Sequence, residues 1–125
     1  MTYRIVVADD EANIRLLVQQ TLEEAFDEQG LELEVLHAAD GAQALHLVRT
    51  QAPHLLITDV MMPEMDGFEL TSRIRQDPAT GKLPVIILTI VDDDGQAASA
   101  GADFQFSKPI NSAQLLRGVA ALLFS

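Results

Sequence analysis

Five short apolar runs recur along the chain, separated by longer stretches of mixed polarity. The runs are rich in β-branched and other aliphatic or aromatic residues, and each is too short to be an ordinary helix. They occupy residues 5–8, 33–36, 55–58, 85–89 and 104–106. An unbroken apolar run, rather than an alternating one, is typical of a strand that is covered on both faces. The pattern therefore predicts the strands of a buried parallel sheet.

The stretches between these runs carry apolar residues at helical spacing. They cover residues 11–28, 41–50, 66–76 and 92–100, and a last stretch follows Asn111, which can cap a helix. Strands and helices thus alternate five times, which predicts an α/β fold with a parallel sheet between two layers of helices. No linker or low-complexity segment interrupts this order, so residues 1–125 are predicted to form a single domain.

Composition excludes several classes of function. The 125 residues include 8 Lys and Arg against 19 Asp and Glu, which gives a net charge of −11 and makes direct binding to nucleic acid or to an anionic membrane unfavourable. No cysteine is present, so a disulfide framework and a thiolate site are excluded. The first apolar run is too short for a signal peptide, and no run reaches the length of a membrane span. We therefore expect a cytoplasmic protein.

Polar side chains that could bind a ligand or take part in a reaction follow the predicted strands. Asp9 and Asp10 come directly after the first apolar run and Asp59 after the third, while Thr89 ends the fourth and Lys108 follows the fifth. In an open parallel α/β sheet, ligands bind in the crevice beyond the carboxyl ends of the strands. Each residue alone is ordinary for a loop or strand end. Their common location predicts one shared pocket.

The chemistry of such a pocket follows from its charges. Three carboxylates at close range repel one another and need a compensating cation or raised pKa values. Donor sets made only of oxygen favour a hard cation, Mg²⁺ before Zn²⁺. Carboxylates, Mg²⁺, an ammonium and a hydroxyl together can stabilise a phosphoryl group during transfer, and a carboxylate can itself be the nucleophile.

Several motifs, in order along the chain, closely resemble the receiver domain of two-component response regulators in the CheY-like superfamily. They are Val7-Ala8-Asp9-Asp10-Glu11, Ala39-Asp40-Gly41, Thr58-Asp59-Val60-Met61-Met62-Pro63-Glu64-Met65-Asp66-Gly67, Ile87-Leu88-Thr89, Ala100-Gly101-Ala102-Asp103 and Lys108-Pro109. The resemblance covers essentially the whole chain. It implies a flavodoxin-like, doubly wound (βα)5 fold whose five parallel strands have the order 2-1-3-4-5.

The resemblance also implies a set of residues for phosphoryl transfer. Asp59 would be the phosphoacceptor. Mg²⁺ would be bound by Asp10, by Asp9 directly or through water, by Asp59 and by the backbone carbonyl of Met61.

On the same basis, Thr89 and Lys108 would contact the phosphoryl group, and the Lys108–Pro109 peptide would be cis. The donor would be a phosphohistidine on a sensor histidine kinase or a histidine phosphotransfer protein. The domain would catalyse its own phosphorylation and slow dephosphorylation, and would switch contacts with an output domain or effector protein.

Three features depart from the pattern of that family. Gln105 stands where the family has a Tyr or Phe whose rotamer reports phosphorylation, and Phe104 and Phe106 should point to the opposite face of their strand. Ile90 replaces a small residue after Thr89, from which we expect a long-lived phosphorylated state. The segment from Thr89 to Gly101 is short by about three residues, nearly one helical turn, which predicts a short fourth helix.

Two other functions stay open at this point. The first is a receiver-like interaction module that has lost phosphorylation, which Gln105 and Ile90 favour. The second is a nucleotide- or flavin-dependent enzyme on the same fold, which is disfavoured because the chain has neither a Gly-x-Gly-x-x-Gly nor a Gly-x-x-x-x-Gly-Lys loop. A phosphoacceptor signalling domain explains the five residues of the predicted pocket better than either alternative.

Overall fold

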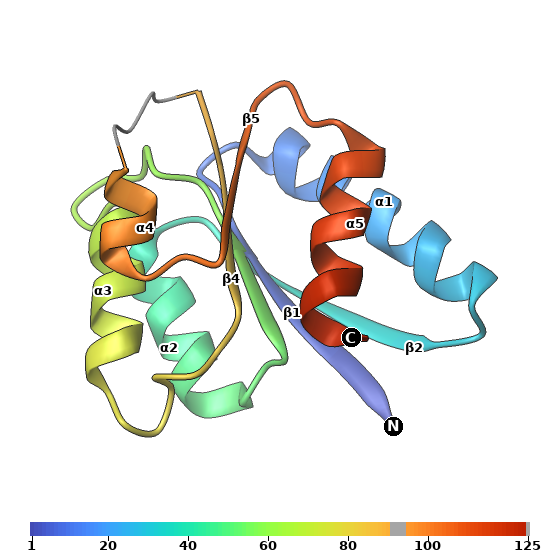
Figure 1. Cartoon of the computed structure of the whole chain (residues 1–125), viewed down its shortest axis with the longest axis horizontal. Helices are drawn as coiled ribbons and strands as arrows, with labels where there is room; N and C mark the ends of the chain where they lie inside the picture. The colour runs from blue at the N-terminus through green and yellow to red at the C-terminus, as the bar shows by residue number, and fades with distance from the viewer. Residues whose placement is uncertain (91–94, 125) are drawn as a thin grey trace.

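A computed structural model describes residues 1–90 and 95–124 of the chain. Strands and helices alternate from one terminus to the other (Figure 1). Their bounds are β1 Thr2–Ala8, α1 Ala12–Glu28, β2 Glu32–Ala38, α2 Gly41–Gln51, β3 Leu55–Thr58, α3 Gly67–Gln76, β4 Val85–Thr89, α4 Gln96–Ala100, β5 Phe104–Ser107 and α5 Ser112–Leu123.

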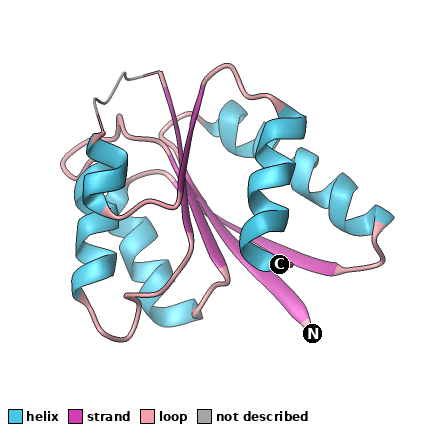
Figure 2. Cartoon of the chain, viewed as in Figure 1, coloured by secondary structure: helices cyan, strands magenta, loops and turns pink. Residues whose placement is uncertain are grey.

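All strand pairs in the sheet are parallel, and the strand order is β2-β1-β3-β4-β5. Figure 2 shows the strands in the middle of the molecule with helices on both sides. Helices α1 and α5 cover one face, and α2, α3 and α4 cover the other (Figure 1). This arrangement confirms the α/β class, the doubly wound architecture and the strand order 2-1-3-4-5.

Two hydrophobic cores lie on the two faces of the sheet. Neighbouring residues of β1 alternate between them, since Val6 packs with the core under α2 and α3, whereas Ile5 and Val7 pack with the core under α1 and α5. The side chains of β3 and β4 are buried throughout. Burial on both faces explains why these strands appear in the sequence as unbroken apolar runs.

The predicted bounds of the strands differ from the structure mainly at β1 and β2. β1 and β2 are longer than their apolar runs because residues of mixed polarity, from exposed Thr2 and Glu32 to buried Ala38, also join the ladder. Arg4 of β1 pairs with Glu34 of β2 at 3.0 Å. A search for apolar runs misses such strand ends. Phe124, just after α5, is 46% exposed, although its ring contacts those of Tyr3 and Phe26.

The helices lie close to the predicted stretches, and polar side chains cap the starts of α3 and α5. Asp66 caps α3 by accepting a hydrogen bond from the Glu69 amide at 2.8 Å, and Asn111 caps α5 through the Gln114 amide at 3.0 Å. Helix α4 is short, as expected, but part of its predicted range, residues 92–94, lies outside the described residues. Within residues 1–90 and 95–124, none of the helices combines the length and apolar character that a membrane crossing needs.

Candidate functional site

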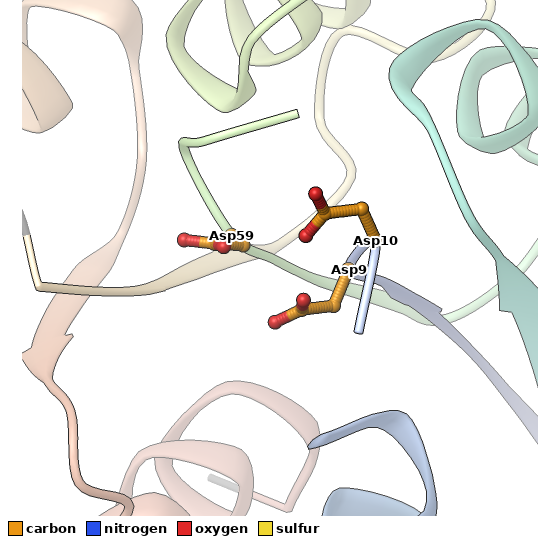
Figure 3. Close-up of side chains that lie close together, drawn as sticks. All are labelled: Asp9, Asp10 and Asp59. Carbon is orange, nitrogen blue, oxygen red and sulfur yellow. The ribbon is translucent and has the colours of Figure 1, made fainter. Parts of the chain in front are cut away.

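Three carboxylates meet at the carboxyl ends of β1 and β3. Ala8 and Thr58 are paired as the last residues of the adjacent strands β1 and β3. Asp9 and Asp59 directly follow them. The Asp59 amide donates to the Ala8 carbonyl at 2.9 Å and continues that ladder. Asp9, Asp10 and Asp59 each offer one oxygen atom, and these atoms lie within 4.8 Å of one another (Figure 3).

Lys108 supplies a positive charge from the far end of the chain. Its Nζ lies 2.8 Å from Asp9 Oδ2 and 3.2 Å from Asp59 Oδ2. Burial alone would lower the pKa of Lys108, but the hydrogen bond to Asp9 and the negative charges of Asp59 and Asp9 outweigh burial and raise that pKa above its ordinary value. The ammonium therefore holds two buried carboxylates together.

Backbone amides fix the other oxygen of each buried carboxylate. Asp9 Oδ1 accepts from the Glu11 amide at 2.9 Å, and Asp59 Oδ1 accepts from the Val60 amide at 2.7 Å. Asp9 and Asp59 are nearly inaccessible to solvent, whereas Asp10 is exposed. The site thus has two fixed carboxylates at its floor and one that solvent reaches.

Thr89 lies at the same sheet edge and is buried. Its carbonyl accepts from the Lys108 amide at 3.1 Å, which joins the ends of β4 and β5 beside the pocket. The Lys108–Pro109 peptide is cis, as predicted. The structure therefore brings the carboxylates and Lys108 into direct contact or close range and places Thr89 next to them through the backbone.

Two apolar residues beside the pocket, Ile90 and Met61, are exposed at the surface. Ile90 is 72% exposed, so its side chain lies at the surface beside Thr89 and is not packed into the site. Met61 is 56% exposed. Phe104 and Phe106 stack at 5.8 Å and pack with the core under α1 and α5, which confirms that they share the face opposite to Gln105.

The loop from β3 to α3 holds Asp59 by a close backbone approach. A Cβ atom on Gly67 would lie 2.1 Å from the Asp59 carbonyl oxygen, so only glycine fits at the start of α3. The Gly67 amide donates to the Val60 carbonyl at 2.9 Å and closes the loop. Glu64, in the same loop, has a φ of 68°, a conformation that non-glycine residues adopt with strain.

Sequence reasoning assigned no role to Arg15, yet it contacts this site. Its Nη1 donates to the backbone carbonyl of Asp9 at 2.6 Å. The residue lies on the first turns of α1, six positions after Asp9, and no motif marks it. Its spacing from the acidic pair is the one signal that could have indicated the contact, because the start of a helix that follows a strand faces back toward the end of that strand.

Comparison with known proteins decides the family. Residues 5–120 match the model of the response regulator receiver domain. The chain belongs to this family. Response regulator PleD of Caulobacter vibrioides is 37% identical over 126 residues, which cover 98% of this chain and 26% of PleD. The receiver domain described here therefore spans only part of that relative.

Solved receiver domains have the same fold. Chemotaxis response regulator CheY4 of Vibrio cholerae has a TM-score of 0.83 and 30% identity, covering 98% of this chain and 100% of CheY4. The signal receiver domain of a DNA-binding response regulator from Colwellia psychrerythraea 34H has a TM-score of 0.88 and 28% identity, covering 98% and 99% of the two chains. The chain is thus a CheY-like receiver domain of two-component signalling.

Membership in this family has a general implication for the site. Receiver domains generally bind Mg²⁺ through an acidic pocket, and the three carboxylates at the ends of β1 and β3 are such a pocket. The hard oxygen donors of Asp9, Asp10 and Asp59 fit Mg²⁺.

Proposed function

We propose that Asp59 accepts a phosphoryl group from a phosphohistidine of a sensor histidine kinase or a histidine phosphotransfer protein. The phosphorus–nitrogen bond of the donor breaks, a bond forms between phosphorus and a carboxylate oxygen of Asp59, and the imidazole leaves. The observation that carries this proposal is the position of Lys108, whose ammonium lies 3.2 Å from Asp59 Oδ2. That charge can neutralise the oxygens of an incoming phosphoryl group.

We further propose that Asp9, Asp10, Asp59 and the backbone carbonyl of Met61 bind Mg²⁺. When bound, this ion neutralises negative charge on the phosphoryl oxygens and on the acidic pocket. The exposed carboxylate of Asp10 gives the ion access from solvent, while the fixed carboxylates of Asp9 and Asp59 hold it at the sheet edge.

In this proposal Lys108 has two partners in succession. Without phosphate, its ammonium pairs with Asp9 and Asp59. With phosphate on Asp59, it pairs with a phosphoryl oxygen, and the Thr89 hydroxyl donates a hydrogen bond to another. The change at the ends of β4 and β5 would then alter contacts with an output domain or effector protein. We place this signalling in the cytoplasm, with residues 1–125 acting as one receiver domain.

Phosphorylation by a small donor tests the proposal. With Mg²⁺ and acetyl phosphate, the intact mass of the protein should rise by one phosphoryl group, and Asp59→Asn should abolish the increase. Asp66→Asn is a matched control, because Asp66 is an exposed aspartate that caps α3 rather than lining the pocket. Incorporation that persists in Asp59→Asn would disprove the assignment.

The alternative is an interaction module that has lost phosphorylation. Gln105 favours it, because no aromatic side chain stands at that position of β5 to report a phosphorylated Asp59. Beryllofluoride, a mimic of the phosphoryl group, separates the two functions. NMR shifts of the Thr89 and Lys108 amides on addition of beryllofluoride and Mg²⁺ would support phosphoacceptance. Mg²⁺ binding with no response to beryllofluoride would support the interaction module.

A further inference from the structure

A chain of polar side chains connects β2 and α1 to the acidic loop. Arg15 donates from Nη1 to the Asp9 carbonyl at 2.6 Å and from Nε to Nδ1 of His37 at 3.2 Å. The Nε2 atom of His37 in turn contacts Oε1 of Gln19. The order is thus Gln19, His37, Arg15 and then the backbone of Asp9.

The partners in this chain define the state of His37. Because an arginine Nε can only donate, Nδ1 of His37 must be the accepting, unprotonated nitrogen. Nε2 then carries the proton and donates a hydrogen bond to the side-chain oxygen of Gln19. Burial and the nearby charge of Arg15 both lower the pKa of His37, which favours this neutral form. The imidazole therefore orients the guanidinium of Arg15 without competing with its charge.

Asp9 is consequently fixed at every polar atom. Its amide donates to the Ala38 carbonyl at 3.1 Å, its carbonyl accepts from Arg15, and its carboxylate oxygens accept from the Glu11 amide and Lys108. A metal ion bound here would compete with Lys108 for the carboxylate of Asp9. The contact with Arg15 involves the backbone and is compatible with metal binding.

We propose that Arg15 is a positioning residue for the metal-binding loop, and that His37 and Gln19 hold Arg15 in place. By fixing the carbonyl between Asp9 and Asp10, Arg15 sets the orientation of the peptide that joins two carboxylates of the acidic pocket. The inference rests on the proposed function, because it assigns Arg15 to the same Mg²⁺ site.

Charge and position predict different outcomes for Arg15. Its positive charge beside the pocket repels Mg²⁺, so a role through charge alone means that removal of the charge tightens binding. A positioning role means that loss of the hydrogen bonds weakens binding even when the charge remains. Arg15→Lys separates these roles, since lysine keeps the charge but lacks the planar group that bonds Asp9 and His37 together.

Mg²⁺ calorimetry on the whole chain is the first test. Arg15→Lys should weaken Mg²⁺ binding by about tenfold, the scale typical of residues that orient metal ligands. Arg73→Lys is the matched control and should bind Mg²⁺ as the wild type does, because Arg73 is exposed on α3 and pairs with Glu69 of the same helix. Unchanged affinity in Arg15→Lys would overturn the inference. Absence of Mg²⁺ binding in the wild type would instead overturn the proposed function.

A second readout needs no metal. In EDTA, hydrogen exchange of the Glu11 amide, which donates to Asp9 Oδ1, should be faster in Arg15→Lys than in the wild type. His37→Phe removes the acceptor that orients Arg15 but leaves Arg15 itself in place, so it should weaken Mg²⁺ binding by a smaller factor, about threefold, and add nothing in the double variant with Arg15→Lys. Additive effects, or equal exchange rates, would contradict the proposed network. His37→Phe also decides the matter if Arg15→Lys fails to fold.

Discussion

Lys108 explains how two buried carboxylates, those of Asp9 and Asp59, lie close together at one sheet edge. Asp9 and Asp59 are 3% and 6% exposed at their side chains, and burial of an unpaired carboxylate is costly. The ammonium of Lys108 is shared by both, and backbone amides satisfy the remaining oxygens. The same charge that stabilises the resting pocket is therefore available to a phosphoryl group.

Removal of this charge should destabilise the metal-free protein. Lys108→Met leaves Asp9 and Asp59 unpaired, and loss of one partner from a buried ion pair costs about 3 kcal/mol. Urea unfolding in EDTA should show this loss, and Mg²⁺ should restore more stability to the variant than to the wild type. Lys82→Met is the control, because Lys82 is exposed and lies before the start of β4, whereas the pocket lies at the carboxyl ends of the strands. Equal stability of Lys108→Met and wild type in EDTA would contradict this account.

His37 should make stability depend on pH. Burial, and then the charge of Arg15, lower its pKa in the folded state from 6.5. The unfolded chain therefore takes up the proton first as the pH falls. The stabilising contribution of neutral His37 is complete above pH 6.5 and is lost as the pH falls through the lower, folded pKa. Urea unfolding between about pH 7.5 and pH 5 should show a steeper loss for the wild type than for His37→Gln. Parallel curves would exclude this contribution.

At the scale of elements, one arginine joins α3 to the segments on either side of it. Arg75, in the last turn of α3, donates to the Leu83 carbonyl at 2.6 Å, to the Gly101 carbonyl at 2.9 Å and to Asp103 at 3.2 Å. Asp103 also accepts from the amide of Val85 at 2.9 Å. The start of β4 and the connection from α4 to β5 are thus anchored to α3 by one guanidinium.

Loss of this anchor should cost far more than loss of a surface charge. Arg75→Met leaves carbonyls of two connections without their donor, and we expect about 2 kcal/mol of destabilisation. Arg73→Met, two residues earlier on the same helix, should cost less than about 0.5 kcal/mol because Arg73 is exposed. Chemical denaturation of both variants measures the difference. Equal effects would show that Arg75 acts only as a surface charge.

These elements show where sequence reasoning succeeds and where it fails. β3 and β4 were predicted because burial on both faces favours unbroken apolar runs, and the cap of α5 was predicted because the Asn111 side chain bonds the helix within three residues. The ends of β1 and β2 were missed because cross-strand pairs such as Arg4–Glu34 join residues far apart in sequence. The contacts of Arg15 and Arg75 were missed because most of their acceptors are backbone carbonyls, which every residue type carries.

At the scale of the whole molecule, the site is a product of topology. The parallel order β2-β1-β3-β4-β5 places the carboxyl ends of β1 and β3 side by side, so Asp9 and Asp59 meet although 50 residues separate them in number. Lys108 reaches both from the end of β5. The identity of these residues could be predicted because the rule for strand ends is general. Their distances and shared hydrogen bonds could not, since they depend on rotamers and loop paths.

The net charge of −11 gives the molecule two separable responses to cations. Repulsion among surface carboxylates, such as the exposed Glu23, Glu24, Asp27 and Glu28 of α1, opposes the compact state and is screened by any salt. Binding at the acidic pocket is different, because an ion held by the folded state alone stabilises it in proportion to the logarithm of its concentration.

Raising KCl from about 20 mM to about 500 mM should therefore raise the melting temperature of the wild type, and Mg²⁺ at matched ionic strength should raise it further. The additional gain from Mg²⁺ should disappear in Asp10→Asn, whereas the gain from KCl should persist. The double variant Glu23→Gln and Glu24→Gln should show the reverse, a smaller gain from KCl with the gain from Mg²⁺ retained. Equal responses to KCl and Mg²⁺ at matched ionic strength would mean that the carboxylates of the pocket act only as part of the diffuse surface charge.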